Sequence, residues 1–178
     1  MDNICARCHK MGLGCCFFKE TANNIQIGIF YDDILKIEGF IGQDKNHFIV
    51  REEISNNIRE SLSKKAHPVF DKIYHKNSSF KLKVVDGQCI FLADSGCKLP
   101  EDKRPLYCRI YPFWLSFDNR HINVLSSYDC LAQKKSTLSW AVVNQHFGYS
   151  EEYIRELFRE IELAGDRHVL NLEYLHSG

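Results

Sequence analysis

Apolar and polar positions change their period several times along the chain, and each period predicts a different element. Residues 25–29 alternate isoleucine with polar or small residues, which predicts a strand. Residues 31–38 carry apolar side chains at helical spacing, and Gly39 is the expected end of that short helix. In residues 51–65 an apolar residue recurs every fourth position, so we expect a helix that is exposed over most of its circumference.

Two further stretches have the pattern of β-hairpins. Residues 80–85 and 88–93 flank an Asp-Gly pair, the strongest short-range signal for a two-residue turn because both positions tolerate positive φ. This hairpin would place Cys89 on its second strand. Residues 113–117 and 121–126 predict a second hairpin, and the last cysteine of the chain follows it a few residues later.

The carboxyl-terminal part has a helical pattern over residues 137–165. We expect one helix over 137–147 and another over 151–164, with Ser150 as the N-cap and Gly165 as the C-cap of the second. Together these elements predict an α+β fold of several helices and short antiparallel hairpins, with the cysteines at the connections.

Length and composition agree with one globular domain. A chain of 178 residues can bury roughly 70% of its unfolded surface, and a hydrophobic content of 44% supplies the core. We find no internal repeat, low-complexity tract or linker. We therefore expect a single domain over residues 1–178.

The balance of charge excludes some partners. The 23 Lys and Arg residues match the 23 Asp and Glu residues, so the chain lacks the long-range attraction to nucleic acid or to an anionic membrane. No apolar run reaches the ~18 residues of a transmembrane helix, and residues 1–18 hold cysteines and charges where a signal peptide has its apolar region. We expect a cytoplasmic protein that binds neither nucleic acid nor membrane; the sequence indicates no particular protein partner.

Eight cysteines are the chemically informative feature. A reducing compartment does not favour disulfides, and the cysteine content lies below the roughly 8–10% of a disulfide-held scaffold. Metal binding or redox chemistry is therefore the leading interpretation, with metal ions as the expected partners. The eight candidate ligands are Cys5, Cys8, Cys15, Cys16, Cys89, Cys97, Cys108 and Cys130.

The cysteines fall into two groups of four along the sequence, and we expect metal ligation to interleave the two groups. A C-x2-C step, as in Cys5 and Cys8, lets one tight turn present two thiolates to one ion. Cys15 and Cys16 are neighbours whose side chains point apart in extended backbone, so we expect them to serve different centres. One of them would join the Cys5 and Cys8 site and the other would join cysteines of the second half. The metal would then close a long loop, and its binding energy would count as folding energy.

Several motifs resemble those of one family. They are the amino-terminal C-x2-C followed by Gly-Cys-Cys, a later Cys-x-Phe-Leu, a Gly-Cys pair, and Arg-Pro-x-x-Cys-Arg-x-Tyr-Pro-Phe over residues 104–113. The chain resembles, over about residues 5–130, the YkgJ-like cysteine-cluster proteins, described as zinc- or iron-chelating domains; its spacing between Cys8 and Cys15 is longer than the family's. The resemblance implies that the eight cysteines bind zinc or iron. A similar region occurs in flagellin lysine methylases, which implies an iron–sulfur cluster as an alternative.

The thiolate donors alone do not determine which metal binds. Zinc and iron–sulfur clusters both take four cysteines, so Zn²⁺, iron and a [4Fe–4S] cluster all stay open. Four thiolates on Zn²⁺ leave a net charge of about −2 that nearby cations can offset. Arg104 and Arg109 flank Pro105 and Cys108 and are our candidates for this cofactor-binding role, whereas Lys98 and Lys103 have the pattern of a solvated surface.

Some residues have other interpretations. His9, next to Cys8, can replace a cysteine in a Cys₃His site, and Cys130 can be a buried small hydrophobic side chain. The aromatic residues of the 107–117 stretch are typical of core packing. Four carboxylates are candidates for acids or bases in a site, but their spacing does not distinguish them from surface carboxylates: Glu20, Asp32, Asp33 and Asp129.

Two classes of function fit these patterns. In the first, which we favour, the metal stabilises the fold and the protein stores, delivers or senses metal or electrons. Its ligands would be saturated and sealed by Phe17, Phe18, Phe91 and Tyr111. The second is an iron–sulfur-dependent group-transfer enzyme related to flagellin lysine methylases, which needs a pocket with converging polar groups beside the metal. The sequence holds no recognisable cosubstrate motif and identifies no catalytic residue.

Overall fold

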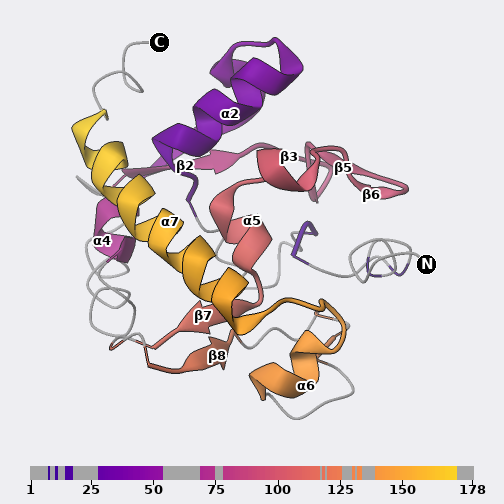
Figure 1. The fold of residues 1–178 in the computed structure, drawn as a ribbon. Coiled ribbons are helices and arrows are strands. Elements are labelled where there is room, and N and C mark those ends of the chain that lie inside the picture. Colours follow the sequence, from indigo (N-terminus) through magenta and orange to yellow (C-terminus); the bar gives the residue numbers. More distant parts are fainter. Residues whose placement is uncertain are drawn as a thin grey trace.

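The structure of the chain is a computed structural model that describes residues 8, 11, 15–17, 28–53, 69–74, 78–116, 118, 120–125, 130, 132–133 and 139–171. These residues form a mixed α+β structure of helices and short two-stranded antiparallel sheets (Figure 1). This confirms the predicted fold class; the metal site expected among these elements stays a prediction. The helices are α2 (Tyr31–Ile41), η1 (Lys45–His47), α4 (Val69–Ile73), η3 (Glu101–Lys103), α5 (Leu106–Ile110), α6 (Trp140–Asn144) and α7 (Glu151–Leu170). The strands are β1 (Ile49–Glu53), β2 (Ser78–Leu82), β3 (Val84–Val85), β4 (Gln88–Cys89), β5 (Leu92–Ala93), β6 (Gly96–Cys97), β7 (Phe113–Leu115) and β8 (Ile122–Val124).

Helix α2 is longer than the sequence predicts. The expected end at Gly39 is wrong, because the helix continues to Ile41 and ends at Gly42, whose φ of 65° is left-handed. The backbone N–H of Gly42 donates to the carbonyl of Glu38 at 2.9 Å and closes the last turn.

Strands β1 and β2 form an antiparallel pair in which Ile49 lies opposite Leu82 and Glu53 lies opposite Ser78. The helix predicted over 51–65 is therefore wrong for Arg51–Glu53, because a strand distant in sequence supplies their hydrogen-bond partners. Residues 54–65 lie outside the described residues. Of the strand predicted over 25–29, only the last two residues are described, and neither lies in a strand.

The predicted Asp-Gly turn is confirmed. Asp86 and Gly87 have φ values of 50° and 75°, and the turn joins β3 to β4. The hairpin is shorter than expected at both ends, since residues 80–82 belong to β2 and residues 92–93 pair with β6 in a further hairpin. The hairpin predicted after residue 113 is also confirmed, as β7 pairs with β8.

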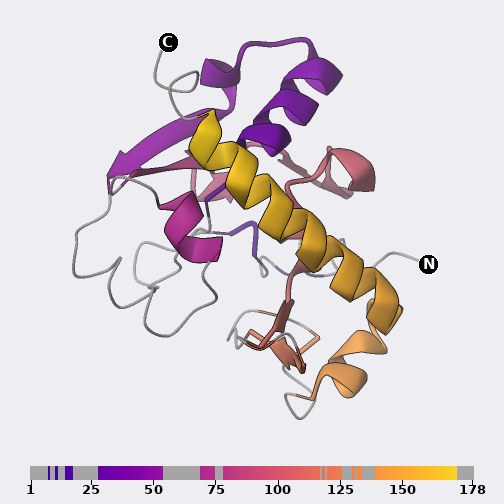
Figure 2. The same cartoon turned by 60° about the vertical axis from the view of Figure 1, so that its left-hand side comes forward.

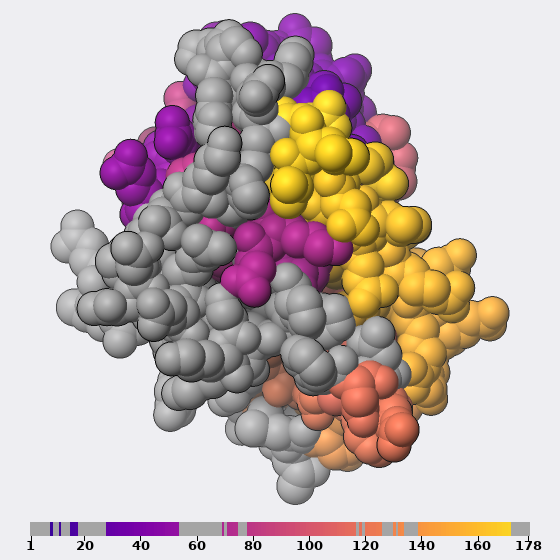
Figure 3. All heavy atoms as spheres, turned by 90° about the vertical axis from the view of Figure 1, so that its left-hand side faces the viewer, coloured from indigo at the N-terminus to yellow at the C-terminus, as the bar shows by residue number. Residues whose placement is uncertain are grey.

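Helix α7 begins as predicted and runs further. The Ser150 hydroxyl accepts a hydrogen bond from the backbone N–H of Tyr153 at 3.0 Å, which confirms this N-cap. The end predicted at Gly165 is wrong, because the helix runs to Leu170. Gly165 is instead the contact with α4, where a Cβ would lie 2.9 Å from Cδ of Lys72 and 3.1 Å from Cγ2 of Val69. Figure 3 shows α4 and α7 side by side on one face.

The helix predicted over 137–147 is present as the shorter α6; its first two positions lie outside the described residues. Helix α7 also contacts α2 and α5, so with α4 it contacts three of the other α-helices in the described part of the chain (Figure 2).

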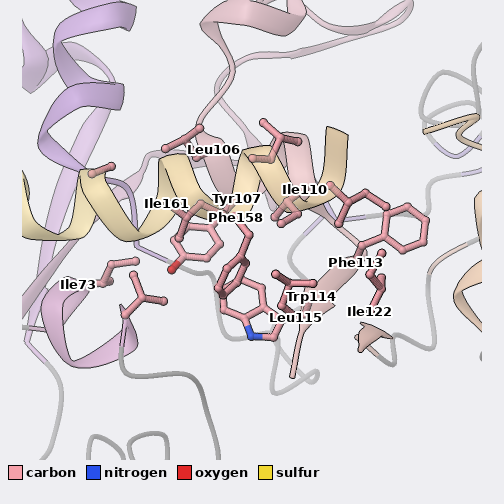
Figure 4. Close-up of a cluster of buried hydrophobic side chains, with 14 of the residues drawn as sticks. Ile73, Leu106, Tyr107, Ile110, Phe113, Trp114, Leu115, Ile122, Phe158 and Ile161 are labelled. Carbon is pink, nitrogen blue, oxygen red and sulfur yellow. The ribbon is translucent and has the colours of Figure 1, made fainter. Parts of the chain in front are cut away.

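Among the described residues, buried hydrophobic side chains form two clusters. The first, which we call the α7 cluster, joins α4, α5, α7 and the β7–β8 hairpin (Figure 4). In it the Tyr107 ring stacks on Trp114 at 5.5 Å, and Trp114 meets Phe158 edge to face at 5.0 Å, so the predicted aromatic packing is confirmed for these residues. The second, which we call the α2 cluster, joins α2 to the β1–β2 pair: Ile29, Ile34, Ile37, Phe48, Ile49, Phe80, Leu82, Phe91 and Leu99.

Candidate metal centre

One cavity collects the cysteines that the structure describes. Its lining takes thiols from the amino-terminal segment, from two hairpins, from α5 and from the segment after β8. Its volume of about 90 Å³ is several times the roughly 10–15 Å³ that one water molecule needs. The lining cysteines are Cys8, Cys15, Cys16, Cys89, Cys97, Cys108 and Cys130. Cys5 and the alternative ligand His9 lie outside the described residues.

The other walls of the cavity are mostly apolar. They include Phe17, Phe91 and Tyr111, three of the four aromatic residues expected to seal the site; Phe18 lies outside the described residues. Of the remaining apolar lining, Leu92 and Pro105 belong to the cysteine motifs of the sequence, whereas the sequence did not single out Leu82, Leu99 and Phe147. Apolar walls of this kind lower the local dielectric constant, which strengthens the electrostatic interactions between a bound cation and its thiolates.

Cys16 reaches the cavity because the amino-terminal segment pairs with the first cysteine hairpin. The backbone N–H of Cys89 donates to the carbonyl of Cys16 at 2.9 Å, and Phe17 forms an antiparallel bridge with Gln88. Two segments far apart in sequence are thereby held side by side through the backbone.

The two small hairpins bring Cys89 and Cys97 to the same wall. Cys89 is the last residue of β4 and Cys97 is the last residue of β6. The backbone N–H of Lys98 donates to the carbonyl of Phe91 at 2.8 Å, which extends the β5–β6 hairpin by one pair beyond Leu92 and Cys97. Both cysteines pack against the α2 cluster.

Cys108 is placed by the short helix α5. Pro105 precedes the helix, and the backbone N–H of Arg109 donates to the Pro105 carbonyl at 3.1 Å. The surface of Cys108 is accessible where it lines the cavity. The surrounding protein nonetheless desolvates the thiolate, and this raises the pKa of Cys108 well above its usual range.

Cys8 and Cys130 are the two buried cysteines of the lining, with 8% and 5% of their surface exposed. Cys130 belongs to the α7 cluster, whereas Cys89 and Cys97 pack against the α2 cluster. Its carbonyl accepts a hydrogen bond from the backbone N–H of Gln133 at 3.0 Å, in a turn. Cys15 is exposed at the cavity rim.

The seven described cysteines are free thiols. They share a cavity, yet no three His, Cys, Asp or Glu side chains within the described ranges already stand at the spacing of a metal site. Binding a metal therefore has to draw the thiols together. Thiols are soft donors that bind metal as thiolates, so their donor chemistry fits zinc and iron.

Burial raises the pKa of several of the lining thiols. It is the first cause of a raised pKa at Cys97 and Cys130, and it raises the pKa of Cys89 to about 12. At Cys16 the hydrogen bond with the Cys15 thiol is the first cause of the raised pKa and burial is the second. A metal ion would have to displace protons from these sulfurs on binding.

Arg104 supplies the positive charge of the lining. Its Nε–H donates to the carbonyl of Leu99 at 2.9 Å, which fixes the guanidinium at the cavity. Its charge acts to lower the pKa of Cys97 and of Cys16, against the larger effects that raise them. This position fits the predicted role of Arg104 as a charge partner of bound thiolates.

Arg109 faces a different neighbour. Its Nη1 lies 3.4 Å from Oε2 of Glu160 on α7, and the residue is absent from the cavity lining. In this structure Arg109 therefore connects α5 to α7, and no described contact links it to the cysteines.

Asp33 is a residue near the site that sequence reasoning missed. Its spacing in the sequence did not distinguish it from surface carboxylates, but the structure buries it fully. Oδ2 accepts from the backbone N–H of Phe30 at 3.2 Å, and Oδ1 accepts from the backbone N–H of Leu106 at 3.1 Å. Burial raises the pKa of Asp33 to about 7. Its place in the first turn of α2 was the available signal, because carboxylates there cap backbone N–H groups.

Comparisons of the chain with protein-family models, with curated proteins and with solved structures found no match. The resemblance to YkgJ-like proteins therefore stays a prediction that rests on the motifs alone. No helix in the described part of the chain has the length and apolar character needed to cross a membrane.

Proposed function

We propose that this chain is a metal-binding protein that holds zinc or iron, the latter alone or as an iron–sulfur cluster, through thiolates from both halves of its sequence. The observation that carries the proposal is the meeting of seven cysteines at one cavity. Buried thiols can also serve as small apolar side chains. Larger apolar side chains could have filled the cavity, yet seven thiols line it. This arrangement favours a metal that the thiols bind together.

The apolar walls favour a closed centre over a catalytic one. A group-transfer enzyme needs polar groups that converge beside the metal. Within the described lining, Arg104 is the charged residue, and the remaining non-cysteine positions are apolar or aromatic apart from Gly96. The group-transfer enzyme thus remains the second candidate, supported only by the resemblance of the cysteine motifs.

Arg104 gives the proposed centre its charge balance. A four-thiolate zinc site carries about two negative charges, which cost free energy in an apolar cavity unless a cation lies close by. The Arg104 guanidinium is held in place by the Leu99 carbonyl and already interacts with two of the thiols. We include it in the site and leave Arg109 out of it.

The setting that suits this function is a reducing one. The free thiols of the described cysteines remain available as ligands where glutathione and thioredoxin keep them reduced. We therefore propose that the protein works in the cytoplasm with metal ions as its partners.

The test is elemental analysis of the protein purified without oxygen, together with acid-labile sulfide and an optical spectrum. Zinc without sulfide would identify zinc sites, and matched iron and sulfide with brown colour would identify a cluster. Cys108→Ser should lower the metal content. Ile161→Val, which trims the buried core away from the cavity lining, should cost about 0.5–1.5 kcal/mol of stability and leave the metal content unchanged. Protein that contains no zinc or iron and takes up neither would contradict the proposal.

A further inference from the structure

Cys16 and Cys89 lie directly opposite each other on two antiparallel segments. The backbone N–H of Cys89 donates to the carbonyl of Cys16 at 2.9 Å, and the adjacent residues Phe17 and Gln88 form an antiparallel bridge. Hydrogen-bonded residues that face each other in an antiparallel ladder have Cα atoms about 5.5 Å apart. A disulfide needs Cα atoms about 4.4–6.8 Å apart. The backbone of this pair therefore has the register that a disulfide requires.

The two side chains lie on the same side of this ladder. Both Cys16 and Cys89 line the cavity, and both are free and half-buried. Directly opposed Cβ atoms are about 4.5–5.5 Å apart, and a disulfide draws them to about 3.5–4.5 Å. Closing the bond therefore takes a movement of about 1 Å, and a small molecule can reach thiols that are exposed to this extent.

The cysteines next to this pair are less well placed for a disulfide with it. Cys15 adjoins Cys16 through a trans peptide bond, and Cα atoms joined in this way are about 3.8 Å apart, which is too close for an unstrained disulfide. Cys97 faces Leu92 across its own hairpin. Among the described cysteines, Cys16 and Cys89 are the pair that strand register places face to face.

We propose that Cys16 and Cys89 form a disulfide when the protein meets a small-molecule disulfide such as oxidised glutathione. One protein thiolate attacks a sulfur of glutathione disulfide, which breaks that bond and releases one glutathione thiolate. The second protein thiolate attacks the protein-bound sulfur of the mixed disulfide and releases the other glutathione. The protein gives up two electrons and two protons, and both are recovered in two molecules of reduced glutathione.

The effect of this disulfide on metal binding rests on the proposed function. A sulfur that has joined a disulfide is no longer a thiolate, so the bond removes two of the cavity's ligands. Reduced glutathione in excess reverses the exchange and restores them. The pair would then release metal under oxidation and allow it to bind again under reduction, while the bond keeps the amino-terminal segment attached to β4.

Disulfide mapping of the protein as purified tests the pair. The protein is incubated with oxidised glutathione, alkylated, digested without reduction and analysed by mass spectrometry. Cys16 linked to Cys89 should be the dominant protein disulfide, and the same treatment in concentrated denaturant should spread the linkages over several cysteine pairs. A dominant link between another pair, glutathione adducts without a protein disulfide, or the same dominant link in denaturant would overturn the proposal.

A matched variant tests the register. Cys15→Ser removes the exposed neighbour of Cys16, and the link between Cys16 and Cys89 should still form in it. Loss of the link in this variant would show that strand register does not select the pair.

Metal release separates this inference from the proposed function. In metal-loaded protein, the metal captured by a coloured chelator should increase in step with the disulfide. A disulfide that forms while all the metal is retained would contradict its effect on metal binding. Protein that neither contains nor takes up metal would contradict the proposed function, and the mapping would still decide whether Cys16 and Cys89 pair.

Discussion

The carboxylate of Asp33 accepts a hydrogen bond from the backbone N–H of Leu106 at 3.1 Å, and this contact joins the first turn of α2 to the first residue of the helix that carries Cys108. Asp33 also accepts from the N–H of Phe30, so its two oxygens hold two chain segments together in a fully buried position. A residue that binds no metal thus positions one of the proposed ligands.

Asp33→Asn should destabilise the protein by about 1–3 kcal/mol at pH 5, because the amide nitrogen cannot accept from either backbone N–H and leaves one of them unsatisfied. The start of α5 should shift, and metal affinity should fall with it. Denaturant unfolding and metal titration measure the two effects. The matched control is Asp32→Asn: Asp32 is the neighbouring carboxylate and pairs with Arg167 on the surface at 2.6 Å, so we expect a change of no more than about 1 kcal/mol. Equal effects of the two variants would contradict the positioning role of Asp33.

The same carboxyl predicts a dependence of stability on pH. Burial raises the pKa of Asp33 in the folded state to about 7, from 3.8 as its ordinary value. The folded state therefore retains a proton that the unfolded state has already lost, and the free energy of unfolding should decrease as pH rises from about 4 to about 7. The loss should be on the order of a few kcal/mol. In the Asp33→Asn variant, the free energy of unfolding should change less with pH over this range than it does in the wild type. A difference between them that does not change with pH would show that Asp33 does not titrate in this window.

Arg104→Gln should weaken metal binding about 10-fold or more, because it removes the cation beside Cys97 and Cys16. Arg109→Gln is the matched control, since Arg109 pairs with Glu160 and lies outside the cavity lining. Competition titration against a chelator of known affinity measures both variants. If both arginine variants lose the same affinity, the two arginines act on the centre alike and our exclusion of Arg109 is wrong.

Gly165→Ala and Gly39→Ala should change stability in opposite directions. A Cβ at Gly165 meets Lys72 and Val69 of α4 at 2.9 and 3.1 Å, and such overpacking costs about 1–3 kcal/mol. At Gly39 on α2 a Cβ meets nothing within 4 Å, so alanine should gain up to about 1 kcal/mol from helix propensity. Thermal unfolding measures the stability of both variants. If both are more stable than the wild type, α4 can shift to accommodate the added methyl group, which would contradict the predicted overpacking.

Features set by neighbouring residues could be predicted from the sequence, and features set by distant ones could not. The Asp86-Gly87 turn and the Ser150 cap are local, and both are confirmed. Arg51–Glu53 form a strand because β2 pairs with them, and Gly165 lies inside a helix because α4 packs on it. Neither partner is visible in the local pattern.

The same distinction between local and distant residues applies to the candidate site. Which side chains carry the chemistry was evident from the cysteines, although their role as ligands stays a prediction. Their meeting at one cavity depends on contacts such as Cys89 with Cys16, which only the fold provides. The structural role of Asp33 could not be predicted from the sequence, because its second hydrogen-bond partner, Leu106, lies far along the chain. The extent of the domain, 1–178, also stays a prediction.

The most direct measurement of the central claim is an X-ray absorption spectrum at the edge of the bound metal. If thiolates from both halves of the chain hold the metal, its nearest shell consists of sulfur, at about 2.3 Å for zinc. The double variant Cys16→Ser with Cys108→Ser removes one lining thiol from each half of the chain, and it should have fewer sulfur neighbours around the metal or lose the metal. A shell of nitrogen and oxygen in the wild type, or an unchanged sulfur shell in the double variant, would contradict the account.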